Sequence, residues 1–248
     1  GANPAFQRYL SRWDRVANRH HFLVAYPQGS SFPLRFNAGP VYKIPEIDDV
    51  QLIRDLIDEI SRSFNIDRKR VYVNGMSGGA HMADRIACEL ADQVAAVGMV
   101  SGSYLELPGD KKPARAMPVI AFQGTADPFG GYRGRTEDSR VLLGIMKLIN
   151  LAPGKVIEMP AFEKWAENWA RRNGCDLTAA KWETEKDIRR LCYPNYLNNG
   201  EVEIYLVEGG GHTWPGGSPT FIGKSTRSIN ASETMWAFFD SHPLPDAW

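Results

Sequence analysis

One serine of the chain lies in a pattern that can make it a nucleophile. Gly75-Met76-Ser77-Gly78-Gly79 follows a short apolar run, Val71 to Val73, and precedes a segment with apolar residues at helical spacing. A strand that turns sharply into a helix exposes a serine oxygen above the sheet edge, and the flanking glycines avoid clashes in the strained turn. The pattern predicts Ser77 as a nucleophile and the Gly78 amide, near the helix N-terminus, as an oxyanion donor.

A serine hydroxyl is a poor nucleophile at neutral pH and needs a histidine base that an acid orients. Asp127 lies in the loop after the apolar run Val119 to Phe122, and His212 lies after the run Val202 to Val207. The order Ser, Asp, His is the one that triads follow on the α/β-hydrolase fold. We therefore predict a catalytic triad of Ser77, Asp127 and His212.

The other histidines lack such a setting. His81 lies four positions beyond Ser77, where it could support the site, although a capping or solvated histidine is the simpler interpretation. No group of His, Cys or carboxylate residues has metal-ligand spacing, and no glycine-rich phosphate loop occurs. We expect no metal and no cofactor.

The elements that must position these residues alternate between strands and helices. Four of the five apolar runs with strand character are solidly apolar, which is typical of strands buried on both faces of a parallel sheet. The five runs are Phe22 to Tyr26, Val71 to Val73, Val94 to Val100, Val119 to Phe122 and Val202 to Val207.

Helical patterns lie between these runs. Asn3-Pro4 offers an N-cap and a proline at N1, and Asp48-Asp49 caps another helix. The predicted helices run from Pro4 to Asn18, from Asp49 through Ile60, from Gly78 onward, from Ala161 to Arg172 and from Ala231 to Phe239. The alternation predicts an α/β fold of the α/β-hydrolase type, a mostly parallel sheet with helices on both faces.

Size and charge bound the classes of function. The 248 residues fit one domain, residues 1–248, in which Phe129 to Pro160 is an inserted excursion that could cover a site. The 29 Lys and Arg residues balance the 29 Asp and Glu residues, so no basic field exists to hold nucleic acid or an anionic membrane. An ester substrate, small or polymeric, suits this charge; the oligomeric state is not set by the sequence.

The chain has three cysteines, Cys88, Cys175 and Cys192. The spacing of the last two, 192 − 175 = 17 positions, permits a local disulfide worth about 3 kcal/mol if the geometry allows it. The alternative is three free thiols, as in a cytosolic protein.

Several runs resemble the bacterial poly(3-hydroxybutyrate) depolymerase-like esterases, a group that contains feruloyl and acetylxylan esterases. The resemblance extends from about Trp13 to Pro243. It is carried by Phe36 to Pro40, Asp48 to Val50, Val71 to Gly79, Gln123 to Pro128 and Gly209 to Gly217. It implies the α/β-hydrolase sheet, the triad roles given above, and a secreted or periplasmic protein. Cys175 matches a family position and Cys192 resembles its partner, which favours the disulfide.

Two departures from the family affect the expectations. Family members carry further strands and a His-Gly loop ahead of the first helix, where this chain opens, so we expect N-terminal strands and the second oxyanion donor to be missing from these 248 residues. The chain alone would then be a weak enzyme. The excursion over 129–160 is also longer than the family suggests.

The expected activity is hydrolysis of hydroxycinnamoyl (feruloyl) or related plant cell-wall esters through an acyl-enzyme. The alternatives are a polyester depolymerase and a catalytically silent binding module. Trp214, two positions after His212, is predicted to border the substrate pocket and stack on an aromatic acyl group. Its alternative role is to pack inward and brace the loop.

Overall fold

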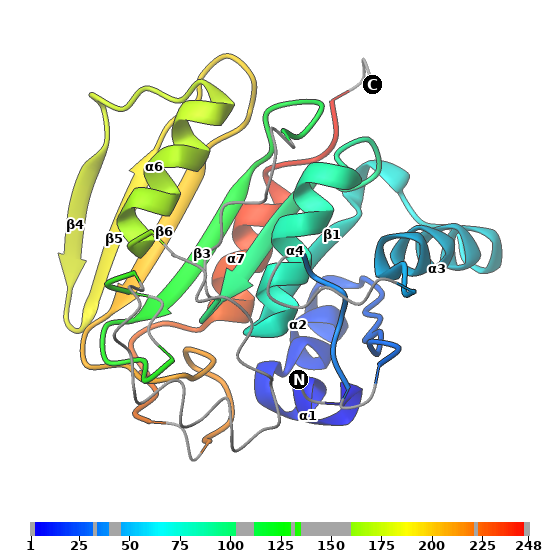
Figure 1. Cartoon of the computed structure of the whole chain (residues 1–248), viewed down its shortest axis with the longest axis horizontal. Helices are drawn as coiled ribbons and strands as arrows, with labels where there is room; N and C mark the ends of the chain where they lie inside the picture. Colours follow the sequence, from blue (N-terminus) through cyan, green and yellow to red (C-terminus); the bar gives the residue numbers. More distant parts are fainter. Residues whose placement is uncertain are drawn as a thin grey trace.

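A computed structural model describes residues 3–31, 34–39, 46–102, 112–129, 132–134, 160–220 and 223–245. In this described part, six strands form one sheet in the order β1-β2-β3-β6-β5-β4. Figure 1 shows β4, β5, β6 and β3 side by side. The strands are β1 (Tyr72–Met76), β2 (Ala96–Val100), β3 (Val119–Gly124), β4 (Lys181–Glu185), β5 (Ile188–Tyr193) and β6 (Val202–Val207). β1, β2, β3 and β6 are parallel, whereas β5 and β4 are antiparallel to their neighbours. The predicted mostly parallel sheet is confirmed.

The apolar runs explain the centre of the sheet. Every residue of β2, β3 and β6 is buried, as expected for strands covered on both faces. The predicted strand Phe22 to Tyr26 is wrong, because these residues belong to no strand in the structure. The β4–β5 hairpin was not predicted; all five residues of β4 are exposed, so no apolar periodicity marks it.

The helices begin where their capping residues predict. The Asn3 side chain accepts a hydrogen bond from the Phe6 N–H at 2.8 Å and opens α1 (Pro4–Ser11). The predicted single helix is divided at Arg12, whose φ of 55° ends α1 before α2 (Trp13–His20). Asp48 caps α3 (Asp49–Ser63) through two backbone N–H groups, as predicted.

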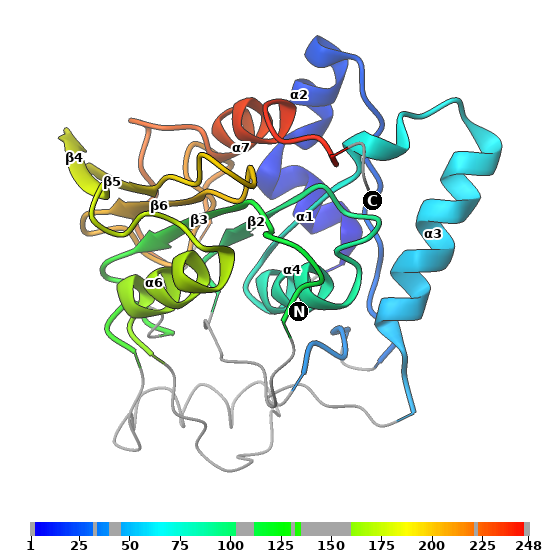
Figure 2. The same ribbon diagram turned by 90° about the horizontal axis from the view of Figure 1, so that it is seen from above.

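Helices cover both faces of the sheet, as the sequence predicts (Figure 2). α4 (Gly78–Glu89) and α6 (Phe162–Asn173) lie on one face, and α7 (Ala231–Asp240) lies on the other beside α2. Buried apolar side chains form one core on each face of the sheet. No helix in the described ranges is long and apolar enough to cross a membrane. The predicted excursion over 129–160 lies almost entirely outside the described residues.

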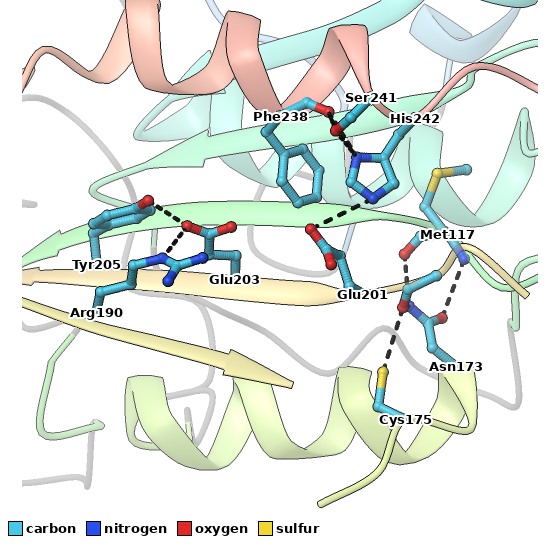
Figure 3. A network of polar contacts seen from close by, with 11 residues as sticks. Met117, Asn173, Cys175, Arg190, Glu201, Glu203, Tyr205, Phe238, Ser241 and His242 are labelled. Carbon is cyan, nitrogen blue, oxygen red and sulfur yellow. Dashed lines mark hydrogen bonds and ion pairs between the residues drawn. The ribbon is translucent and has the colours of Figure 1, made fainter. Parts of the chain in front are cut away.

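Polar contacts around β5 and β6 connect the segment after α7 to this side of the sheet (Figure 3). Glu203 of β6 accepts hydrogen bonds from the Arg190 guanidinium at 2.5 Å and from the Tyr205 hydroxyl. His242, just beyond α7, places Nε2 3.5 Å from a carboxylate oxygen of Glu201. These contacts connect elements far apart in the sequence and do not reach the edge of the sheet that carries Ser77.

Candidate active site

Ser77 occupies the turn between β1 and α4. Its φ of 55° and ψ of −119° lie in a region that residues with a side chain rarely adopt, and the strain is held by the surrounding chain. Its N–H donates to the Val100 carbonyl at 3.0 Å, beyond the end of β1. A Cβ at Gly75 would overlap the carbonyl of Gly79, so the first position of the motif must lack a side chain. This geometry is the strand–turn–helix elbow that the motif predicts.

The loops that carry Asp127 and His212 contact each other at the carboxyl ends of β3 and β6. A Cβ at Gly124, the last residue of β3, would overlap the carbonyl of Gly210 in the loop after β6. The Ala126 N–H donates to that Gly210 carbonyl at 2.9 Å. Because the two loops touch backbone to backbone, residues that are 85 positions apart in the chain meet.

The meeting of these loops forms a buried histidine–carboxylate pair. His212 Nδ1 lies 2.9 Å from Asp127 Oδ2, and the two side chains are 9% and 2% exposed. The carboxylate oxygen accepts, so Nδ1 carries the hydrogen and Nε2 is left with the lone pair that a general base needs. The Phe129 N–H donates to Asp127 Oδ1 at 2.9 Å, and the Phe129 ring lies 4.5 Å from the imidazole.

Ser77 and His212 line one cavity of about 780 Å³. No hydrogen bond joins these two described side chains, a common state for catalytic groups without substrate. The cavity extends along β1 toward the segment 20–29, and much of its wall is apolar or aromatic, including Tyr26, Phe36 and Met76. Serine and histidine are therefore placed at one opening.

Gly78 opens α4, so its N–H is one of the amides at the helix N-terminus that have no partner within the helix. The positive end of the helix dipole favours negative charge at this position. The structure thus places the predicted oxyanion donor next to Ser77, where it would act on a developing oxyanion.

Sequence reasoning did not single out Gln123, which contacts the pair directly. Its Nε2 lies 3.1 Å from Asp127 Oδ2. A signal was present, because Gln123 is a polar residue inside the buried strand Val119–Gly124. Only the fold reveals that its amide turns toward Asp127.

Trp214 does not occupy the place expected of a substrate contact. The side chain is 0% exposed and donates from Nε1 to the Ser232 hydroxyl at 3.0 Å. It belongs to the core between the sheet and α7 and is absent from the cavity lining. The expectation of a pocket residue is corrected: Trp214 braces the loop that carries His212.

The structure gives Cys88, Cys175 and Cys192 as free thiols, so the predicted disulfide is not present in it. Burial raises the pKa of Cys175 to about 11 and that of Cys192 to about 12. Glu201, Glu203 and the neighbouring Cys175 add to the rise at Cys192. Thiols with such high pKa values carry little of the thiolate that reacts to form a disulfide.

Three similar proteins bear names that agree with this site. Feruloyl esterase B of Piromyces equi is 30% identical over 77% of this chain and 33% of its own length. NocK of Nocardia uniformis subsp. tsuyamanensis, provisionally named an esterase, is 28% identical over 96% of this chain and 70% of its own. Poly(3-hydroxyalkanoate) depolymerase C of Paucimonas lemoignei is 25% identical over 83% of this chain and 51% of its own.

Among solved structures, an acetyl xylan esterase from Aspergillus awamori matches with a TM-score of 0.62 at 13% identity, over 97% of this chain and 85% of that one. This likeness confirms the α/β-hydrolase type of fold. No family model matches the chain. The named relatives confirm the predicted resemblance to the depolymerase-like and feruloyl esterases, and the chain spans about a third of the length of feruloyl esterase B.

Proposed function

We propose that the chain is a serine carboxyl-ester hydrolase that acts through an acyl-enzyme. The observation that carries the proposal is the buried His212–Asp127 pair at a cavity that also holds the strained Ser77. The esterase names of the similar proteins support the same class of reaction.

In the proposed reaction, Ser77 Oγ attacks the ester carbonyl carbon while His212 Nε2 takes the hydroxyl proton. Asp127 holds the imidazole through Nδ1 and stabilises the positive charge that it gains. The Gly78 N–H donates to the oxyanion. His212 then returns the proton to the departing alcohol, and a water molecule, activated by the same nitrogen, releases the acid and restores Ser77.

The proposed substrates are hydroxycinnamoyl or related plant cell-wall esters. Feruloyl esterase B among the similar proteins supports this class, and the aromatic and aliphatic side chains of the cavity suit an aromatic acyl group. A polyester depolymerase is the second candidate, favoured by the similarity to the poly(3-hydroxyalkanoate) depolymerase. A silent binding module is the third, and the intact Asp127–His212 pair argues against it.

Steady-state kinetics on a panel of esters test the proposal. The panel contains methyl ferulate, p-nitrophenyl acetate and 3-hydroxybutyrate oligomers, each with wild type and with Ser77→Ala as the control for contaminating esterase. Hydrolysis that is highest for methyl ferulate and absent from Ser77→Ala supports the proposal. A preference for the oligomers supports the depolymerase, and no hydrolysis of any ester leaves the binding module.

We also propose that the protein is exported and that Cys175 and Cys192 pair during oxidative folding, before burial suppresses their thiolates. The Asp176 N–H donates to the Pro194 carbonyl at 3.0 Å, which supports the proximity of the segments that carry Cys175 and Cys192. Thiol titration under denaturing conditions decides this. One reactive thiol, from Cys88, supports the pairing in protein made in an oxidising compartment, and three reactive thiols contradict it.

A further inference from the structure

The carboxylate of Asp127 has a second side-chain partner besides His212. Gln123, near the end of β3, donates from Nε2 to Asp127 Oδ2 at 3.1 Å and to the Gly124 carbonyl at 3.2 Å. Oδ2 is also the oxygen that binds His212 Nδ1 at 2.9 Å. The same oxygen therefore accepts from the imidazole and from the amide at once.

The orientation of the Gln123 amide follows from its neighbours. Asp127 Oδ2 and the Gly124 carbonyl are both acceptors, so the amide nitrogen must face them. The amide oxygen is then turned into the protein, where it is buried without a hydrogen-bond partner, and the residue is 1% exposed. An apolar side chain would remove this unfavourable burial. The position holds an amide nonetheless, and among the described residues the charged group that this amide contacts is Asp127.

Donation to Oδ2 has two physical consequences. It fixes the rotation of the carboxylate, whose other oxygen is held by the Phe129 N–H at 2.9 Å. It also withdraws negative charge from the atom that stabilises the imidazolium of His212. Without the amide, Oδ2 would attract the imidazolium more strongly, and the imidazole would stay protonated to higher pH.

We infer that Gln123 is a positioning residue of the proposed hydrolase, which orients Asp127 and tunes the basicity of His212 through their shared Oδ2. This inference rests on the proposed function. The side chain does not line the cavity, so it acts on the reaction through Asp127 and makes no contact with the substrate.

Gln123→Met tests the inference, because methionine has a similar shape and no hydrogen-bonding amide. We expect kcat on p-nitrophenyl acetate to fall about tenfold through loss of orientation, with KM unchanged. The acidic limb of the kcat pH profile should move up by about half a pH unit. Gln123→Asn, whose amide is one methylene too short to reach Oδ2, should behave alike.

Gln93→Met is the matched control. Gln93 also has a buried amide oxygen without a partner. However, it lies before β2, near the amino ends of the parallel strands, whereas Ser77 follows the carboxyl end of β1. This variant should keep the wild-type rate and pH profile. A purely structural role for Gln123 predicts a lower melting temperature with an unmoved acidic limb, and that result would overturn the inference.

Titration of the His212 ring followed by NMR separates this inference from the proposed function. A midpoint that rises in Gln123→Met and stays in Gln93→Met supports the inference whether or not the wild type hydrolyses esters. An equal midpoint in all three proteins overturns it. Failure of the proposed function would instead appear as an inactive wild type, or as full activity in Ser77→Ala.

Discussion

Within the described residues, two buried histidines each face a carboxylate, and they differ in what surrounds the imidazole. His212 binds Asp127 through Nδ1 at 2.9 Å, and His242 faces Glu201 through Nε2 at 3.5 Å. His212 lines the cavity that holds Ser77. His242 lies beyond α7 among the residues of Figure 3, with its ring 4.2 Å from that of Phe238.

The difference lies in which nitrogen is left available. His242 Nδ1 lies 2.6 Å from the Phe238 carbonyl, which can only accept, so Nδ1 carries a hydrogen and Nε2 is turned to Glu201. Both nitrogens of His242 are thus engaged by the protein. In His212 the carboxylate takes Nδ1 and leaves Nε2 for a reactant. A histidine–carboxylate pair therefore indicates catalysis only where the second nitrogen faces a cavity with a nucleophile.

The neighbouring carboxylates reinforce this contrast. Cys192, Glu201 and Glu203 bring possible metal ligands within 4.8 Å of one another. Glu203, however, is already bound by Arg190 and Tyr205, and the guanidinium next to the cluster would repel a cation. We interpret the cluster as a structural joint between β6, β5 and the segment after α7.

The largest expected effect separates the two histidines. His212→Ala should lower kcat for ester hydrolysis by about 10⁶-fold, because the serine loses its base. His242→Ala should leave kcat and KM unchanged and lower the free energy of unfolding by about 2 kcal/mol, through lost hydrogen bonds and packing. Kinetics and urea unfolding of both variants measure this. Comparable losses of activity in the two variants would contradict the distinction between a catalytic His212 and a structural His242.

A smaller effect is expected at Arg190, whose pKa is raised above its usual range by the hydrogen bond with Glu203. Arg190→Met should lower the free energy of unfolding by about 2 kcal/mol, because it strips the buried Glu203 of its cation, and kcat should not change. Adding Glu203→Gln should recover part of the loss, since no charge is then left unpaired. A double variant less stable than Arg190→Met would contradict this account of the joint.

The smallest effect is a pH dependence of stability at Glu201. Burial raises the pKa of Glu201 above its ordinary value of 4.5; His242 opposes the rise, and Glu203 adds to it. The folded state therefore holds the proton more tightly than the unfolded state does. The resulting stabilisation is complete below pH 4.5 and is lost as the pH rises through the folded pKa, at up to about 1.4 kcal/mol per pH unit.

Glu201→Gln should remove this pH dependence, because the glutamine cannot ionise. The charged or titratable groups that face Glu201 are His242, Glu203, Arg190, Cys175 and Cys192. The matched control is Glu185→Gln. The native Glu185 side chain is 86% exposed, so this variant should leave the pH dependence unchanged. Urea unfolding between pH 4 and pH 8 checks both, and equal slopes in wild type and Glu201→Gln would argue against the raised pKa.

Much of the fold follows from local signals. Asn3 and Asp48 cap helices with their own side chains, and both helices start where the sequence predicts. The elbow follows equally, because a side chain at Gly75 would overlap the Gly79 carbonyl where the strand turns sharply into the helix. The loop positions of Asp127 and His212 follow from the buried strands that precede them.

The incorrect and missing predictions concern contacts with residues that are distant in the sequence. Phe22 to Tyr26 has the composition of a strand, but a strand exists only beside another, and no strand of the described residues pairs with it. The glycines around Trp214 mark a turn and say nothing about the direction of the indole, which the distant Ser232 determines. The bond from Gln123 to Asp127 likewise depends on how the loop after β3 folds back.

The central claim is that Ser77 is the one serine activated by the His212–Asp127 pair. Incubation with phenylmethylsulfonyl fluoride, followed by peptide mass spectrometry, tests it most directly. Ser101→Ala is the matched control, because Ser101 also has a positive φ, 48°, just beyond the neighbouring strand β2. The account predicts one sulfonyl group on the Ser77 peptide of wild type and Ser101→Ala, and none in Ser77→Ala or His212→Ala. Labelling that persists in Ser77→Ala, or that survives His212→Ala at the wild-type rate, would contradict it.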